Sequence, residues 1–157
     1  MIAASLPLFK FEADYAATLC CMPMIVRFHL DACRLKLTLA DWQRFDLATR
    51  KSLILLPTSN PTELKHYRRI LLRTSGQQLL RPLGRLPPSR TAPPWRGDVL
   101  PERILRALRD RGLLLDGPQH WSELAPLQRF ALFKLTRPGH ENRNFLLALR
   151  EFDLMAS

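Results

Sequence analysis

WSELAPLQRFALFKLTRPGHENRNFLLALREF, residues 121–152, contains the most apolar helix pattern of the sequence. Apolar side chains surround almost the whole segment 130–135, which is typical of a helix at the centre of a domain. Pro138 and Gly139 end this pattern, and apolar residues at helical spacing resume over residues 140–152. The stretch therefore predicts a buried helix, a break and a closing helix.

An earlier part of the chain has the same pattern. At an offset of 79 residues, without a gap, identical residues recur as the pairs Ile25/Ile104, Arg27/Arg106, Asp31/Asp110, Leu35/Leu114, Trp42/Trp121, Arg50/Arg129, Leu53/Leu132 and Leu56/Leu135. The tryptophan pair is the most informative, because the chain has only three tryptophans. We interpret the pattern as a degenerate internal repeat.

Capping residues predict where the helices of the first half begin. Pro23 suits the first turn of a helix, expected over residues 24–37, because proline has no N–H to leave unbonded there. Asp46 and Asn60 can each accept hydrogen bonds from the free N–H groups of a helix start. They predict further helices over residues 47–56 and from Pro61 onward.

The expected fold is all-α, with the order helix, short tryptophan helix, apolar helix and closing helix in each repeat. The first repeat covers residues 23–76 and the second covers residues 100–154. Residues 77–99 are the expected linker, and its five prolines over residues 82–94 predict an extended connector without a regular element. We expect one compact helical domain over residues 1–157, because this length and a 46% hydrophobic content suffice for a core.

The repeated arginines Arg50 and Arg129 lie on helices that are otherwise apolar. Burying an unpaired guanidinium group costs several kcal/mol, so a carboxylate is expected beside each one. The repeated acids Asp31 and Asp110 are the candidates. We predict two equivalent structural ion pairs, without a catalytic role because no nucleophile or metal ligand repeats with them.

The net charge is +10, which suggests an anionic partner. Part of the excess lies in the linker, and part follows Lys65, Arg68, Arg69 and Arg73 on the outer face of a predicted helix. A solvated face explains this distribution, since no groove-reading module or base-stacking motif accompanies it. Nucleic-acid binding is kept as an alternative that we do not expect.

No run of apolar residues is long enough for a membrane span, so we expect a cytoplasmic protein. The nearest approach to a metal site is the region 20–33, with Cys21, His29 and Cys33 as weak candidate ligands. Buried thiols explain these residues better, and a metal or iron–sulfur carrier remains the alternative. We expect no resident metal, no cofactor and no enzyme activity, because no catalytic constellation or nucleotide motif is present.

Polar side chains gather at the start of the closing helix. They can serve as caps and surface, or they can form a patch that faces a partner. The candidate partner-binding residues are Arg137, His140, Asn142, Arg143 and Asn144.

Two stretches resemble the bacterial family of nitrate reductase-associated proteins. They are LCCMPMIVRFHLDACRLKLTLADW at residues 19–42, and LQRFALFKLTRPGHENRNF with ALREF within residues 127–152. In the first stretch the residues that follow the family pattern are Cys21, Pro23, Met24, Val26, Arg27, Leu30, Asp31, Cys33, Leu35, Leu37 and Trp42. The doubled Cys20–Cys21 and the long proline/arginine linker depart from that pattern.

The resemblance implies a non-catalytic accessory protein that binds nitrate reductase and supports its maturation or activity in nitrate assimilation. Nitrate reductase is a molybdenum and iron–sulfur enzyme. The family supplies no catalytic residues to carry over. A chaperone for the apoenzyme, a helper in cofactor insertion and a subunit that docks an electron donor are all compatible with the resemblance, and the sequence does not choose among them.

Overall fold

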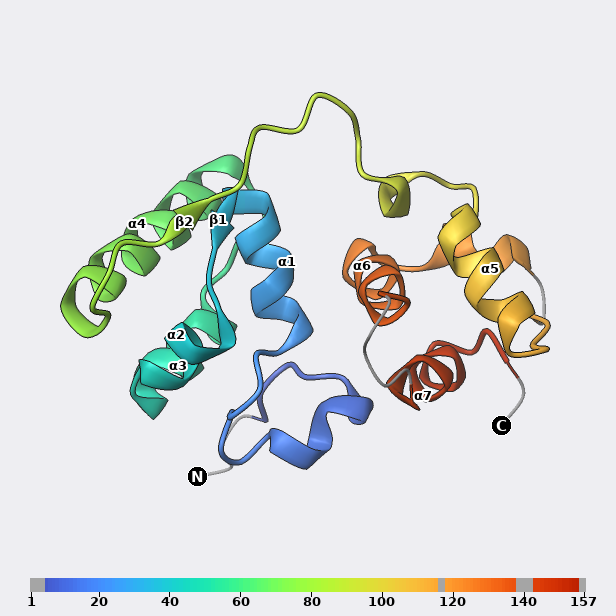
Figure 1. Cartoon of the computed structure of the whole chain (residues 1–157), viewed down its shortest axis with the longest axis horizontal. Coiled ribbons are helices and arrows are strands. Elements are labelled where there is room, and N and C mark those ends of the chain that lie inside the picture. Colours follow the sequence, from blue (N-terminus) through green and yellow to red (C-terminus); the bar gives the residue numbers. More distant parts are fainter. Residues whose placement is uncertain (1–4, 116–117, 138–142, 156–157) are drawn as a thin grey trace. The chain divides into compact units, whose positions relative to one another are not determined.

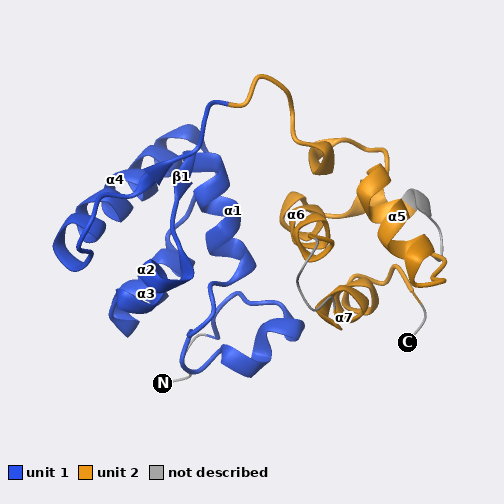
Figure 2. Cartoon of the chain, viewed as in Figure 1, with its two compact units in different colours: residues 1–88 blue, residues 89–157 orange. Residues whose placement is uncertain are grey.

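The computed structural model describes residues 5–115, 118–137 and 143–155. It divides into two compact units, Met1–Pro88 and Ser89–Ser157, so the boundary falls within the proline-rich linker (Figure 2). Both units are mostly helical, which confirms the expected fold class (Figure 1). Whether the two units form the single domain expected from the length stays a prediction.

Unit 1 includes the whole range predicted for the first repeat, residues 23–76. Its elements in chain order are the 3₁₀ helix η1 (Lys10–Tyr15), α1 (Met24–Cys33), β1 (Leu35–Lys36), α2 (Leu39–Arg44), α3 (Leu47–Leu55), α4 (Pro61–Gln78) and β2 (Gly84–Arg85). The predicted caps are confirmed for two of these helices: the Asp46 side chain accepts from the Thr49 N–H at the start of α3, and the Asn60 side chain accepts from the Glu63 N–H at the start of α4.

The core of unit 1 lies among α1, α3 and α4, which pack against one another. Trp42, Leu53 and Tyr67 are fully buried there. The Tyr67 hydroxyl donates to the Leu53 carbonyl at 3.0 Å, so the polar end of the ring is hydrogen-bonded inside the core. Burial of these apolar faces against one another is what stabilises the unit.

The prediction of a helix over residues 24–37 is wrong at its C-terminal end, because α1 ends at Cys33. Arg34 adopts a left-handed backbone with φ 55°, and its N–H donates to the carbonyls of Leu30 and Asp31, which closes the helix. Leu35 then leaves the helix as a strand residue and pairs antiparallel with Arg85. Its side chain is 1% exposed, so the residue is buried as expected but on a strand.

Unit 2 is built from helices. It contains the 3₁₀ helix η2 (Pro94–Arg96), α5 (Glu102–Asp110), the 3₁₀ helix η3 (Pro118–Glu123), α6 (Pro126–Leu135) and α7 (Arg143–Glu151). α6 packs against η2, α5 and α7, so it is the centre of the unit, as its apolar sequence predicts. Phe130, Ala131 and Leu132 on this helix are fully buried.

The linker is more structured than its composition predicts. α4 continues to Gln78, β2 pairs with β1, and η2 packs on α6 through Trp95, whose ring meets Phe130 edge-on at 5.4 Å between centroids. The expectation of no regular element over residues 82–94 is therefore wrong at β2, and η2 begins at the last residue of that range. Proline restricts the backbone without preventing a short 3₁₀ turn that begins at proline itself.

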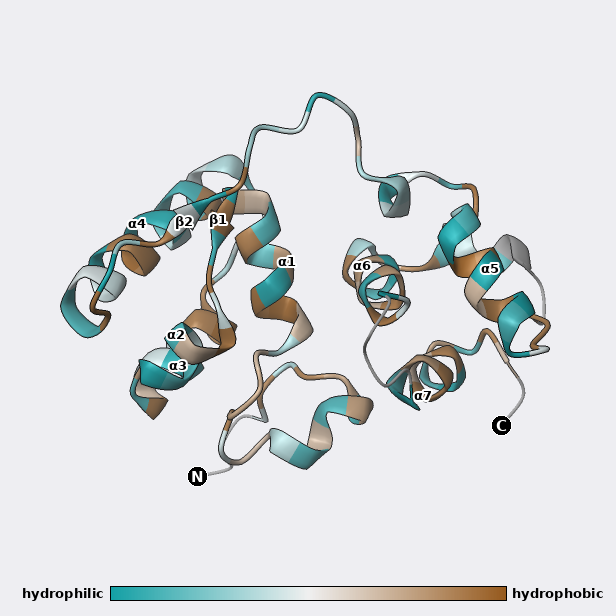
Figure 3. Cartoon of the chain, viewed as in Figure 1, coloured by the Kyte–Doolittle hydropathy of each residue, from teal (hydrophilic) through white to brown (hydrophobic). Residues whose placement is uncertain are grey.

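Hydrophilic and hydrophobic residues alternate along α5, as expected for a helix with one face on a core (Figure 3). Within the described ranges, no helix combines the length and the apolar content that crossing a bilayer requires.

Candidate functional site

The Arg50 guanidinium group binds backbone carbonyls in unit 1. Its Nε donates to the Trp42 carbonyl at 3.2 Å, and its two Nη atoms donate to the carbonyls of Thr18 and Gln43 at 3.0 and 2.7 Å. The neighbouring indole of Trp42 donates to the Leu19 carbonyl at 2.7 Å. Together these bonds attach the segment before α1 to the end of α2.

The Arg129 guanidinium group has the same arrangement in unit 2. Its Nε donates to the Trp121 carbonyl at 3.1 Å, and its Nη2 donates to the Ser122 carbonyl at 2.6 Å. Its Nη1 lies 3.0 Å from the Arg96 carbonyl and 3.1 Å from the Gly97 carbonyl. The guanidinium group is thus enclosed by acceptors, and the residue is only 8% exposed.

These contacts differ from the expected ion pairs. Asp31 contacts Arg34 at 3.8 Å, and the carboxylate beside Arg129 is Asp98, at 3.4 Å. Neither Asp31 nor Asp110 binds the arginine assigned to it. The physical reason is that backbone carbonyl oxygens can accept from the N–H groups of a guanidinium, so its donors are satisfied without burying a second charge.

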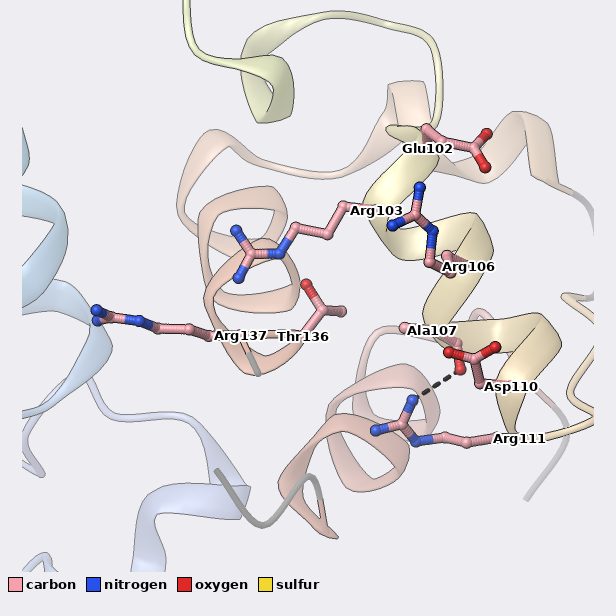
Figure 4. Close-up of a pocket in the computed structure, with 8 residues that line it drawn as sticks. All are labelled: Glu102, Arg103, Arg106, Ala107, Asp110, Arg111, Thr136 and Arg137. Atoms are coloured by element: carbon pink, nitrogen blue, oxygen red, sulfur yellow. Dashed lines mark hydrogen bonds between the residues drawn. The ribbon is translucent and has the colours of Figure 1, made fainter. Parts of the chain in front are cut away.

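A hollow of about 910 Å³ lies in unit 2 between α5 and the residues that follow α6. We call it the arginine groove, and it is lined by Glu102, Arg103, Arg106, Ala107, Asp110, Arg111, Thr136 and Arg137. Figure 4 shows Arg103 extending from α5 toward α6, Arg106 and Asp110 along α5, and Arg137 pointing away from the α5 side chains. Four arginines and two acids thus line one surface.

Helical spacing on α5 predicts surface ion pairs of Arg106 with Glu102 and with Asp110. The ion pairing in the arginine groove is different. In the structure Glu102 bonds Arg109 instead. Arg106 has neither a hydrogen bond nor an ion pair to any described residue. The sequence reasoning missed Arg103 and Arg106 as candidates, and the signal available was their i, i+3 spacing on the polar face of an amphipathic helix.

The predicted partner patch is only partly described. Arg137 lines the arginine groove, Arg143 is exposed and Asn144 is half-buried at the start of α7. His140 and Asn142 lie outside the described residues. The structure therefore connects one member of the patch, Arg137, with the groove.

The weak metal candidates do not form a ligand set. Among the described residues, no group of three or more His, Cys, Asp and Glu side chains could hold a metal ion. Burial raises the pKa of the Cys33 thiol to about 11, and burial together with the neighbouring Cys20 raises that of Cys21. Both shifts favour protonated thiols, whereas a metal needs thiolates.

His29 lies inside unit 1 rather than at a surface site. Its ring is 5% exposed and meets the Tyr67 ring edge-on, at 4.7 Å between centroids. Its Nδ1 has no hydrogen-bond partner in the described part of the chain. Burial lowers the pKa of His29 to about 4, so the side chain is neutral at physiological pH.

Glu12 is a buried charged residue that the sequence reasoning did not single out. Its carboxylate accepts from the Phe9 N–H, from the Tyr15 hydroxyl at 2.6 Å and from the Met24 N–H at 2.9 Å. Met24 is the first residue of α1, where a carboxylate interacts favourably with the helix dipole. Glu12 therefore fixes the N-terminal segment to α1, a structural role.

The comparisons with known proteins give one match. A family model described as conserved nitrate reductase-associated protein matches residues 8–152. Neither a curated protein nor a solved structure matches the chain.

Proposed function

Because the chain belongs to the family of conserved nitrate reductase-associated proteins, we propose that it is a non-catalytic accessory protein that binds nitrate reductase and supports the maturation or activity of that enzyme in nitrate assimilation. The observation that carries the proposal is the family match, which spans nearly all of the described chain. The expectation of a cytoplasmic location follows from this role and is part of the proposal.

The chemistry of the described residues supports a binding role. The unusual polar groups, Glu12, Arg50 and Arg129, all bond to the backbone of their own unit and hold its segments together. Arg103 and Arg106, which have no hydrogen bond or ion pair to a described residue, line the arginine groove. A protein with this distribution presents a surface for recognition.

Copurification tests the proposal. Tagged protein from cells grown on nitrate is expected to recover nitrate reductase, and a tagged unrelated basic protein of the same net charge is the control. Recovery of nucleic acid alone would contradict the proposal.

A second experiment separates maturation from activity. Deletion of the gene is expected to lower nitrate reductase activity per cell, and the molybdenum and iron contents of the enzyme purified from the deletion strain then locate the defect. Loss of metal indicates a role in maturation. Full metal content with low activity indicates a role in supporting the mature enzyme.

A further inference from the structure

We propose that the arginine groove of unit 2 is the docking site for an acidic segment of the partner protein. The inference rests on the proposed function in that it assumes a protein partner. It goes further by assigning the surface and the chemistry of the partner.

Two of the positive charges in the arginine groove are uncompensated. Glu102 is engaged by Arg109, which is not part of the lining. The guanidinium groups of Arg103 and Arg106 have no hydrogen bond or ion pair to any residue that the structure describes. A carboxylate entering the groove would therefore meet cations that need not first break an internal pair.

Contacts within unit 2 hold two of the arginines of the groove in place before a partner binds. The guanidinium carbon of Arg103 lies 4.7 Å from the centre of the Phe133 ring. Arg111 donates to the Ala107 carbonyl at 2.7 Å and lies over the Phe145 ring. A stacked guanidinium group loses less conformational freedom on binding than a free one.

The lining of the groove fits an acidic protein segment better than a nucleic acid or a small anion. The carboxylate of Asp110 lies in the same lining as the arginines, so a continuous row of phosphates would be repelled at that point. Arg106 and Arg137 are exposed, so the groove is open to solvent, whereas a small-molecule site buries most of its ligand. A peptide whose carboxylates are separated by neutral residues can place them beside the arginines of the groove and a neutral residue beside Asp110.

A direct binding experiment uses a short fluorescent peptide in which glutamate alternates with glycine. Its affinity for the full chain is measured by fluorescence anisotropy for wild type, for the groove variant Arg103→Glu/Arg106→Glu and for the control variant Arg69→Glu/Arg73→Glu. The two control positions are exposed on α4 in unit 1, so both variants change the net charge equally. The groove variant is expected to bind about tenfold more weakly or worse, and the control within about threefold of wild type.

Equal weakening in both variants would overturn the proposal, because binding would then follow net charge alone. Tighter binding of a DNA oligonucleotide than of the peptide, lost in the groove variant, would also overturn it and assign the groove to nucleic acid. Thermal unfolding of each variant shows whether it is folded. If charge reversal unfolds unit 2, the neutral variant Arg103→Gln/Arg106→Gln is measured instead, with the same expected ranking.

The same variants in the copurification experiment separate the two proposals. Loss of nitrate reductase with the groove variant, and retention with the control, supports both. Retention with all three proteins overturns the groove as the docking site and leaves the proposed function standing. Specific peptide binding without recovery of nitrate reductase from any of them overturns the proposed function, and the groove remains a site for acidic segments.

Discussion

Arg50 and Arg129 bind equivalent backbone carbonyls in the two halves of the chain. Each donates from Nε to the tryptophan eight residues before it, and from one Nη to the residue after that tryptophan. Each also reaches a carbonyl in the segment that precedes the first α-helix of its unit. We infer from these shared contacts that the two halves are related copies.

The hydrogen bonds from Arg129 to backbone carbonyls predict a large loss of stability even when lysine replaces this arginine. Arg129→Lys removes the planar set of donors and leaves several carbonyls in a buried region without a partner. The free energy of unfolding is expected to fall by about 2 kcal/mol, against about 1 kcal/mol for Arg50→Lys, because Arg50 is half-buried. Urea unfolding measures both, with the exposed Arg143→Lys as control. Equal stability of the Arg129 and Arg143 variants would show that the carbonyl contacts are unimportant.

The hydrogen bonds also show where contacts match the predicted offset of 79 residues and where they do not. From Trp42 and Trp121 onward, residues with matching contacts are 79 positions apart. Arg50 binds the Trp42 carbonyl, and Arg129 binds the Trp121 carbonyl. Before the tryptophans, residues with matching contacts are 78 positions apart. The Trp42 indole binds the Leu19 carbonyl where the Trp121 indole binds that of Gly97.

The end of the first helix follows the same shorter offset. Pro23 and Pro101 each accept from the third and fourth residues after them, and left-handed residues follow at Arg34 and Gly112. The second half has one more residue than the first between the end of this helix and the tryptophan. An ungapped comparison could not detect it. It therefore aligned Asp31 with Asp110, which are not equivalent, and predicted ion pairs that the structure replaces with carbonyl contacts.

The capping signals and the apolar helix were predictable because they are local. Asp46, Asn60 and the apolar run of α6 act within one or two turns of chain. The arginine groove could not be predicted in this way, because its lining joins α5 to Thr136 and Arg137 after α6. Such contacts depend on packing between elements. The burial of Glu12 likewise requires α1 to be in place.

Replacement of Glu12 tests its role as an anchor. Glu12→Gln keeps the shape of the side chain but replaces one acceptor oxygen with a donor, which then faces either the Phe9 N–H or both the Met24 N–H and the Tyr15 hydroxyl. The free energy of unfolding is expected to fall by about 2 kcal/mol. Thermal unfolding measures the change, with the exposed Asp14→Asn as control. A Gln variant as stable as this control would exclude the anchoring role.

Asp41 predicts a loss of stability in acid. Although burial alone would raise its pKa, hydrogen bonds from Thr38 and the Arg81 guanidinium group lower it below the ordinary value of 3.8. A lowered carboxyl pKa contributes stability above the unfolded-state pKa, and that contribution is lost as the pH falls through the folded-state value. Asp41→Asn should cost about 1 kcal/mol at pH 7, with a smaller difference from wild type near pH 2. A difference that does not change between these pH values would contradict the assignment.

His29 predicts a second pH dependence, at higher pH. Its pKa is about 4 in the folded chain against 6.5 in the unfolded one, so only the unfolded state gains a proton between these values. Stability is therefore full above pH 6.5, falls as the pH drops toward 4 and then levels off. The loss between pH 7.5 and pH 5 is expected to be about 2 kcal/mol.

His29→Leu tests this origin, because leucine fills part of the same space beside Tyr67 without a group that titrates. The variant is expected to have a flatter dependence of unfolding free energy on pH between 7.5 and 5, measured by urea unfolding at several pH values. His66→Gln, at an exposed position on α4, should retain the wild-type slope. If the slope survives in His29→Leu, the proton taken up on unfolding belongs to another group, and the unbonded Nδ1 does not set the acid limit of unit 1.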